Sequence, residues 1–339
     1  GSGLVGSEMC IRDSPHTIKK FELIEEYIKS WAQKLLLTES CNGLIFIDCM
    51  CNSGVYTDDA GQLVKGTAVR VSEALREASR SYTEKNIHIY LNDKDKARVD
   101  ELKKHLPQDE RNFKIVTSCG DAHELLRTIG PQLYGTGHLH YFLLYDPYDA
   151  TIDWEALLPF FRNWGEVMIN HMVSDPVRAI TSAKKKTTKA KYENTYLEDF
   201  EKLVPYGSDK KAYEVRVEEI INSLKGARRY YVSAFPFYNT QNSLVYNLIH
   251  CTSNKEGFKL YKKSAWKVFG AQSSTKHSVE DRQLSFNLFG EIAEEEDESC
   301  LHVIDIAKYL QRSFRGRKQV PLDEICLLYT SPSPRDRSL

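Results

Sequence analysis

The 339-residue sequence lacks the features that assign a chain to a membrane or to nucleic acid at first sight. None of its apolar runs approaches the roughly 20 residues of a membrane span, and no secretory signal precedes His16. Its formal net charge is only -1 at pH 7, so the overall charge favours no class of partner. We therefore expect a cytoplasmic protein whose function has to be inferred from local patterns.

Cysteine is scarce and is poorly spaced for a metal site or a disulfide framework. The chain has eight cysteines, of which Cys10 and Cys326 lie in the terminal segments. The other six are scattered through predicted strands and loops, which is typical of reduced thiols in a cytosolic protein. The pair Cys49 and Cys51 lacks the CxxC spacing of zinc and redox sites. We therefore expect no metal.

The two ends of the chain carry sequences that we interpret as non-native. The stretches EMCIRDS and CLLYTS can be encoded by one short DNA element placed in opposite orientations, which resembles a sequencing-transposon adapter translated in frame. Residues 1–14 and 326–339 are then adapter-derived tails, and the natural carboxyl terminus is missing. Two disordered polar tails are the alternative.

The sequence also lacks the GxGxxG fingerprint of dinucleotide-binding proteins. In its place, residues 44–56 (LIFIDCMCNSGVY) form an apolar run that ends at Asp48 and breaks into small residues. An apolar run of this length predicts a strand buried on both faces. In open parallel sheets, ligands bind beyond the carboxyl ends of the strands. Residues 44–56 are therefore a candidate cofactor loop, or simply a core strand followed by a turn.

Further strands and helices alternate along the chain. Apolar segments predict strands at residues 86–92, 113–118, 140–145 and 165–171, and helical periodicity predicts helices at 16–37, 67–83 and 97–106. Asp95 stands where it can cap the helix at 97–106. Alternating strands and helices predict a parallel sheet with helices on both faces.

The alternation ends after residue 171. Residues 230–238 and 244–252 are strand-like and are separated only by NTQNS, which is too short for a parallel crossover. These two strands should therefore be antiparallel. A parallel sheet that ends in an antiparallel hairpin argues against a nicotinamide-dependent dehydrogenase.

In this order of elements the chain resembles class I methyltransferases that use S-adenosylmethionine, and more narrowly the bacterial three-Cys-motif partner proteins, TcmP. The stretches that carry the resemblance are HTIKKFELIEEYIKSW, IDCMCNSGVY, GQLVKGTAVRVSEAL, YLNDKDKARVDELKKHL, LLYDPYD and LVYNLIHCTSNKEGFKLYKKSAW. They cover most of residues 16–269. The resemblance implies an α/β domain at residues 15–270, with a Rossmann-like sheet of seven strands whose last hairpin is antiparallel.

The resemblance also implies a binding site for S-adenosylmethionine. Asp48 and Gly54 match the loop that lies against the methionine part of this cofactor, and Asn52 stands where that loop has its first glycine. Asn tolerates left-handed backbone dihedrals, so the turn can survive the replacement. Asp93 matches the acid that accepts the ribose hydroxyls, and Asp121 the residue that receives the adenine amino group. For each acid, the alternative is a helix cap or a solvated loop.

The segment after the fourth parallel strand resembles the catalytic tetrad of methyltransferases that act on nucleobase amino groups. There an acid and a prolyl carbonyl accept the amino hydrogens, and an aromatic ring stacks on the base. Asp146 and Pro147 match this pattern, Tyr148 replaces the second proline, and Asp149 replaces the aromatic residue. The resemblance thus implies catalytic roles for Asp146 and Pro147, and a stacking role for Tyr148.

Residues 182–228 form a predicted helical insertion with a short basic run. Lys184, Lys185, Lys186 and Lys189 are candidate contacts to nucleic acid, or part of a solvated face. Two functions remain open: methylation of a nucleobase amino group in RNA or DNA, and cofactor binding without catalysis by a protein that serves a partner enzyme. A dehydrogenase is a third, disfavoured hypothesis.

The region at residues 271–325 combines an acidic linker with a second helical pattern. Residues 300–314 (CLHVIDIAKYLQRSF) have helical periodicity and are followed by RGRK. In the resembled family this region is a winged helix-turn-helix, so we expect a truncated winged-helix remnant here. An ordinary amphipathic helix is the alternative.

Overall fold

The computed structural model describes residues 15–57, 61–133, 138–148, 150–162, 164–174, 185–203, 210–224, 230–238, 244–269, 314–317 and 319–321. The two predicted adapter tails, Asp149 and Lys184 lie outside the described residues, as does nearly all of the predicted linker and winged-helix remnant. The descriptions below concern the described residues.

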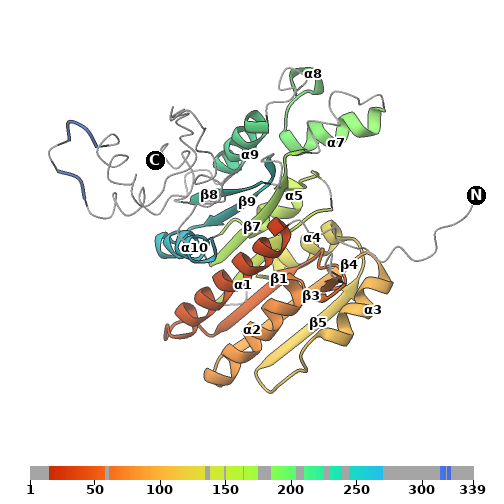
Figure 1. The fold of residues 1–339 in the computed structure, drawn as a ribbon, viewed down its shortest axis with the longest axis vertical. Coiled ribbons are helices and arrows are strands. Elements are labelled where there is room, and N and C mark those ends of the chain that lie inside the picture. Colours follow the sequence, from red (N-terminus) through yellow and green to blue (C-terminus); the bar gives the residue numbers. More distant parts are fainter. Residues whose placement is uncertain are drawn as a thin grey trace, which may run out of the picture.

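The fold is built on a seven-stranded sheet with the strand order β5-β4-β1-β6-β7-β9-β8 (Figure 1). Its strands are β1 (Gly43–Asp48), β4 (Asn86–Asp93), β5 (Phe113–Cys119), β6 (Leu139–Tyr145), β7 (Gly165–Met172), β8 (Tyr231–Tyr238) and β9 (Leu244–Thr252). β5, β4, β1, β6 and β7 are parallel, and β9 is antiparallel to both β7 and β8. This confirms the predicted Rossmann-like sheet of class I methyltransferase type.

Helices cover both faces of the sheet, as the alternating pattern predicted. One face carries α1 (Pro15–Leu36), α2 (Thr67–Ser81) and α10 (Lys255–Val268), which lie side by side in Figure 1, with α3 (Lys96–His105) at its edge. The other face carries α4 (Ala122–Gln132), α5 (Trp154–Leu157), the 3-10 helix η2 (Leu158–Phe160), α7 (Lys186–Tyr196), α8 (Phe200–Leu203) and α9 (Lys210–Leu224). The apolar side chains of alternate strand residues fill these two layers, because successive residues of a strand point to opposite faces.

The register of the central strands brings three acids to one edge of the sheet. Asp48, the last residue of β1, is paired with Leu91 in β4 and with Leu144 in β6. Asp93 and Asp146 each follow those partners by two residues, which is one side-chain period. All three acids therefore lie at the carboxyl ends of neighbouring strands, on the face that α1 covers.

A short hairpin, for which the sequence carries no strand signal, lies between the loop after β1 and the start of α2. β2 (Val55–Thr57) pairs antiparallel with β3 (Leu63–Lys65) in a separate two-stranded sheet. The backbone N–H of Gly66 donates to the carbonyl of Gly54, 2.8 Å away, and thus closes the hairpin at its base. Strands of three residues are too short to show an alternating pattern, which explains why this hairpin was not predicted.

The insertion is helical in its described residues, as predicted, but it is not merely a polar appendage. Its helices bury an aromatic and aliphatic row against the sheet, made of Tyr192, Tyr196, Phe200, Leu203, Tyr213 and Val217. The hydroxyl of Tyr196 lies 3.1 Å from Nε2 of His171 in β7. The insertion is therefore part of the second core layer.

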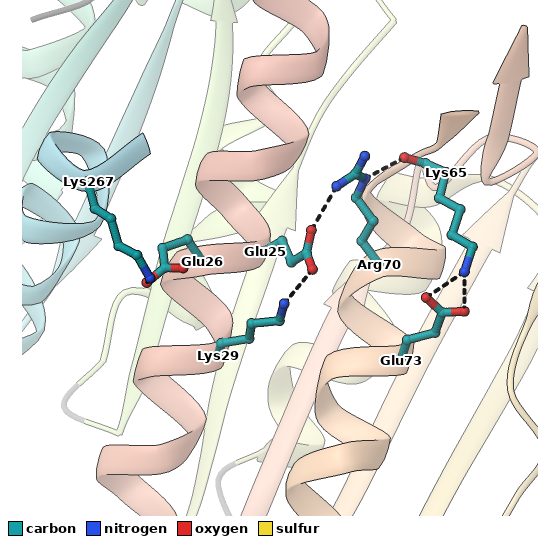
Figure 2. A network of polar contacts seen from close by, with 7 residues as sticks. All are labelled: Glu25, Glu26, Lys29, Lys65, Arg70, Glu73 and Lys267. Carbon is teal, nitrogen blue, oxygen red and sulfur yellow. Dashed lines mark hydrogen bonds and ion pairs between the residues drawn. The ribbon is translucent and has the colours of Figure 1, made fainter. Parts of the chain in front are cut away.

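Ion pairs tie α1 to the elements beside it (Figure 2). The carboxylate of Glu25 accepts from Lys29 on the same helix and from Arg70 of α2, at 2.6 and 2.8 Å. Arg70 also donates to the backbone carbonyl of Lys65, and Glu26 pairs with Lys267 of α10. Because most of these side chains are partly exposed, each pair contributes at most about 1 kcal/mol. Their shared effect is to fix the position of α1 over the strand ends.

Candidate functional site

The candidate site lies where the carboxyl ends of β1, β4 and β6 meet the amino-terminal part of α1. Asp48, Asp93 and Asp146 converge there, and the charges of Asp93 and Asp146 both act on Asp48. Apolar burial of the strands leaves only their ends free to carry polar groups, which is why the acids gather at this edge. Lys20 of α1 is the cation that faces them.

Asp48 is buried, and its pKa is raised to about 8. Loss of hydration is the main cause, and the charges of Asp146 and Asp93 add to it, whereas the N–H of Met50 and the charge of Lys20 oppose it. The N–H of Met50 donates to Oδ1 of Asp48 across 3.1 Å. Asp48 therefore holds its proton more tightly than an ordinary aspartate, and a nearby cation would favour its ionisation.

Asp93 is completely buried, and both of its oxygens are hydrogen-bonded. Oδ1 accepts the N–H of Asp95 at 2.9 Å, and Oδ2 accepts the N–H of Asn52 at 3.0 Å. Oδ2 also accepts the hydroxyl of Tyr148. The predicted ribose acid is thus already bound to a hydroxyl donor of this protein.

The cofactor loop makes the turn that its sequence allows. Asn52 has φ 58° and Gly54 has φ 72°, so both lie in the left-handed region. The turn is therefore made with Asn52 in the position where the resembled loop has its first glycine. A Cβ on Gly54 would stand 2.3 Å from Leu102 and 2.9 Å from Val69, so glycine is required there by packing as well as by φ.

Asp146 is held from two sides. Lys20 Nζ donates to Oδ2 at 2.8 Å, and Asn170 Nδ2 of β7 donates to Oδ1 at 2.6 Å. Asp146 is therefore placed to accept hydrogen bonds and to stabilise positive charge.

Aromatic rings surround the Lys20–Asp146 pair. The ammonium of Lys20 lies 5.3 Å from the ring centre of Tyr246 in β9 and 5.9 Å from that of Phe21. Phe21 in turn stacks on Tyr56 of β2, with ring centres 5.3 Å apart. Burial raises the pKa of Tyr56, with the charges of Asp146 and Asp48 adding to the effect. The surroundings of the pair thus suit a cationic or flat aromatic ligand.

Tyr148 lies at the mouth of the site and is 44% exposed. Lys94 Nζ is 5.5 Å and the guanidinium carbon of Arg98 is 4.9 Å from its ring centre. Burial raises the pKa of the Tyr148 phenol, and its bond to Asp93 adds to this effect. The ring is thus placed beside Asp93, to which its hydroxyl donates.

Two loop acids serve as helix caps. Asp95 accepts the N–H of Ala97 at 2.8 Å and caps α3, as predicted. Asp121, the predicted adenine contact, uses Oδ1 to accept the N–H groups of His123 and Glu124 at the start of α4. The Glu124 bond is the main reason that the pKa of Asp121 is lowered. The cap that was weighed as the alternative for Asp121 therefore exists, and an adenine contact stays a prediction.

The described lysines of the basic run differ in their surroundings. Lys185 and Lys186 are exposed at the start of α7. Lys189 lies 3.6 Å from Glu201 and 4.7 Å from the ring centre of Phe200, so it is engaged within the insertion. Nucleic-acid contact by this run stays a prediction that only Lys185 and Lys186 can readily serve among the described members.

Three polar residues of the site were not predicted from the sequence: Lys20, Asn92 and Asn170. Asn92, near the end of β4, donates to the carbonyls of Cys49 and Gly120 at 3.1 and 3.0 Å and so joins the loops after β1 and β5. A signal existed for each, because a polar residue interrupts the apolar pattern at these positions. The role of each residue, however, depends on partners that are distant in the sequence.

The residues present fit S-adenosylmethionine in the chemistry of their donors and acceptors. Asp93 accepts a hydroxyl from Tyr148, which is the kind of hydrogen bond that ribose would supply. Asp48 can ionise to meet an ammonium or a sulfonium. Asn52, Gly54 and Asp93 lie within one hydrogen-bonded turn. Among the described residues, no three His, Cys, Asp or Glu side chains are grouped so as to hold a metal ion.

Comparisons with known proteins give only distant likenesses. No family model matches the chain, and no curated protein matches it in sequence. A DUF519 family protein from Legionella pneumophila is 10% identical with a TM-score of 0.42, over 75% of this chain and 94% of that one. An O-methyltransferase from Bacillus cereus, solved in complex with SAH, is 10% identical with a TM-score of 0.36, over 67% of this chain and 80% of that one. At scores this low the likenesses add nothing to the strand order, which defines the fold.

None of the helices within the described ranges combines the length and the apolar character that crossing a membrane requires.

Proposed function

We propose that this protein is a cytoplasmic methyltransferase of the TcmP type, which uses S-adenosylmethionine to methylate an amino group of a nucleobase in RNA or DNA. The observation that carries the proposal is the convergence of Asp48, Asp93 and Asp146 on one face at the ends of adjacent strands. Acids at the ends of β1 and β4 suit the cofactor, and an acid after β6 suits the acceptor.

The residues of the chain divide between the two ligands. Asp48, Asn52, Gly54 and Asp93 would hold the cofactor, with Asp121 near its adenine. S-adenosylmethionine supplies an electrophilic methyl group on a sulfonium. Methyl transfer of this kind is assisted chiefly by orientation and electrostatics rather than by a strong base.

Asp146 and Pro147 would serve the acceptor. Asp146 is oriented by its hydrogen bonds from Lys20 and Asn170, and its carboxylate can accept an amino hydrogen and stabilise the positive charge that develops on the nitrogen. The carbonyl of Pro147 supplies a second acceptor, and the rings of Tyr148 and Tyr56 offer stacking surfaces. Lys185 and Lys186 are proposed contacts to the phosphate backbone.

One observation favours the second candidate, a cofactor-binding protein that serves a partner enzyme without catalysis. Each oxygen of Asp146 already accepts a hydrogen bond from the protein itself, through Lys20 and Asn170. In this second function the two bonds are structural, and the acid joins α1 to β7.

Replacing Asp146 separates the two functions. Calorimetric titration with S-adenosylmethionine and S-adenosylhomocysteine should show similar affinity for the wild type and Asp146→Ala, because Asp146 makes no bond to the cofactor loop. Transfer of labelled methyl to total RNA and DNA from a host that lacks the gene should be abolished in Asp146→Ala. The matched control is Asp100→Ala, which removes an exposed acid of α3 and should leave both measurements unchanged.

Other outcomes contradict the proposal. If the wild type binds neither compound, cofactor binding is wrong. If the wild type binds S-adenosylmethionine but labels neither nucleic acid, and Asp146→Ala supports a partner enzyme as well as the wild type does, the partner function replaces methyl transfer.

A further inference from the structure

Asn170 of β7 has a buried hydrogen-bond acceptor that the protein leaves unused. Its side chain is 4% exposed, and Nδ2 lies 2.6 Å from Oδ1 of Asp146. Its own Oδ1 has no hydrogen-bond partner among the described residues. An acceptor removed from water without a partner is unfavourable for folding, so its presence beside the candidate site calls for a ligand.

The orientation of the Asn170 amide follows from its neighbour. An ionised carboxylate can only accept, so the amide nitrogen must face Asp146 and the amide oxygen must point elsewhere. Lys20 donates to the other oxygen of Asp146 at 2.8 Å. Reversing the amide would set two acceptors against each other at 2.6 Å, so the unused oxygen is a fixed feature of the site.

The strand order places Asn170 on the side of Asp146 that is away from the cofactor loop. Asp93, Asp48 and Asp146 belong to β4, β1 and the end of β6, and Asn170 belongs to β7, the next strand. A carboxylate has about four lone-pair positions, of which Lys20 and Asn170 use one on each oxygen of Asp146. Asp146 and Asn170 together therefore offer two adjacent acceptors.

We propose that Asn170 is a specificity-determining residue for the methyl acceptor: it takes the place of the Pro147 carbonyl as the second acceptor and accepts one hydrogen of an amino group whose other hydrogen goes to Asp146. This inference rests on the proposed function. Two adjacent acceptors suit an exocyclic amino group, which carries two hydrogens. The same two acceptors repel a carbonyl oxygen, which carries no hydrogen. Asp146 and Asn170 therefore select adenine-like or cytosine-like bases over uracil-like bases.

The experiment measures binding with the cofactor site occupied and transfer prevented. With S-adenosylhomocysteine at saturation, the wild type should bind adenosine or cytidine roughly tenfold more tightly than the corresponding dimethylamino nucleoside, which has no amino hydrogen. Asn170→Leu, which is similar in size, should lose this preference. Asn170→Ser keeps a hydroxyl that can donate to Asp146 and accept from the ligand, and should retain part of it.

Several results would overturn the inference. One is that the wild type binds the amino and dimethylamino nucleosides equally, or binds neither. Another is that Asn170→Leu keeps the full preference. If Asn170→Leu does not fold, Asn170→Ser decides, and an undiminished preference for the amino nucleoside in that variant counts against the role.

The proposed function fails by a different signal. Absence of heat on titration with S-adenosylhomocysteine alone would reject cofactor binding, whereas loss of nucleoside discrimination with that binding intact rejects only the role of Asn170. In a methylation assay, Asn170→Leu should raise KM for the nucleic acid at least tenfold and leave the affinity for S-adenosylmethionine unchanged.

Discussion

The two ends of the same sheet each bury an acid, but they satisfy it in different ways. At the amino end of β7, Glu166 accepts from Tyr27, His250 and Thr252, and the last two bonds measure 2.9 and 3.1 Å. At the carboxyl ends, Asp93 accepts the hydroxyl of Tyr148, a side chain that is 44% exposed. Both acids are buried, yet only the second has a donor that can leave without unfolding the core.

The donors around Glu166 come from elements that are locked together. Tyr27 belongs to α1 and His250 and Thr252 belong to β9, and all three are buried. A Cβ on Gly257 of α10 would stand 2.5 Å from Oε1 of Glu166, so the backbone of this helix packs directly against the carboxylate. The comparison teaches that burial alone does not mark a binding site. What distinguishes the carboxyl ends is that a ligand can replace one donor there, the hydroxyl of Tyr148 on Asp93.

The largest expected effect is on stability, at the amino end. Glu166→Ala would leave the Tyr27 and Thr252 hydroxyls and the ring of His250 without their shared partner. Removing one member of a buried polar cluster costs about 3–5 kcal/mol, so the free energy of unfolding should fall by about that amount in urea titrations. The affinity for S-adenosylmethionine, measured where the variant is folded, should not change.

The control for this prediction is Glu256→Ala on α10. Glu256 is 59% exposed and pairs with Lys259 and Lys34 at the surface, so its loss should change stability by less than about 1 kcal/mol. A loss below about 1 kcal/mol in Glu166→Ala as well would mean that the two ends of the sheet do not differ as described.

The second prediction concerns the pH dependence of stability at the carboxyl ends. Asp48 has a pKa of about 8 in the folded protein, well above its value in an unfolded chain, chiefly because of burial. The contribution of Asp48 to the free energy of unfolding is therefore fully favourable at acidic pH. It is lost as pH rises toward 8, because the Asp48 carboxyl ionises at lower pH in the unfolded chain than in the folded protein. Asp48→Asn should remove this loss, since Asn can still accept the N–H of Met50.

The measurement compares urea unfolding of the wild type and Asp48→Asn in mildly acidic and mildly alkaline buffers. The wild type should lose on the order of 2 kcal/mol more than the variant over two pH units, since one unit of pKa corresponds to about 1.4 kcal/mol and nearby charges reduce the full value. Parallel curves for the two proteins would show that Asp48 is already ionised beside Lys20.

The architecture was predictable because its signals are local. Each of the seven strands follows from a short apolar segment such as residues 44–48, and the hairpin of β8 and β9 follows from a gap too short for a crossover. The acids of the site were predictable for the same reason, since each ends a strand. The left-handed Asn52 and the cap by Asp95 also follow from the intrinsic preferences of their residue types.

The partners of the acids were not predictable, because they depend on contacts between distant segments. Lys20 and Asp146 are 126 positions apart, and Tyr148 and Asp93 are 55 apart. In the sequence, Lys20 is one polar position on an amphipathic helix and Asn170 is one polar residue in an apolar strand. Only the packing of α1 over the strand ends and the β6–β7 register make them ligands of Asp146.

The smallest expected effect tests most directly whether a ligand replaces the hydroxyl of Tyr148 at the carboxyl ends of the strands. In the unliganded protein the hydroxyl of Tyr148 occupies Oδ2 of Asp93, which is the acid proposed for the ribose hydroxyls. Tyr148→Phe removes that competing donor and keeps the ring between Lys94 and Arg98. S-adenosylmethionine should therefore bind more tightly, by about 1 kcal/mol or roughly fivefold, because its ribose no longer has to displace an existing hydrogen bond.

Calorimetry on three proteins checks this prediction. Asp93→Ala should weaken binding by about 1–3 kcal/mol, because the ribose hydroxyls then lose their acceptor. The double variant should bind no better than Asp93→Ala, since the hydroxyl of Tyr148 competes with ribose only for the carboxylate of Asp93. Unchanged affinity in Tyr148→Phe, together with weaker binding in Asp93→Ala, would mean that ribose and Tyr148 share the carboxylate without competing. Asp93 would then keep its bond to Tyr148 and accept the ligand as well. The two ends of the sheet would differ only in whether a ligand can reach the buried acid, and not in whether a ligand replaces a hydrogen bond of the protein.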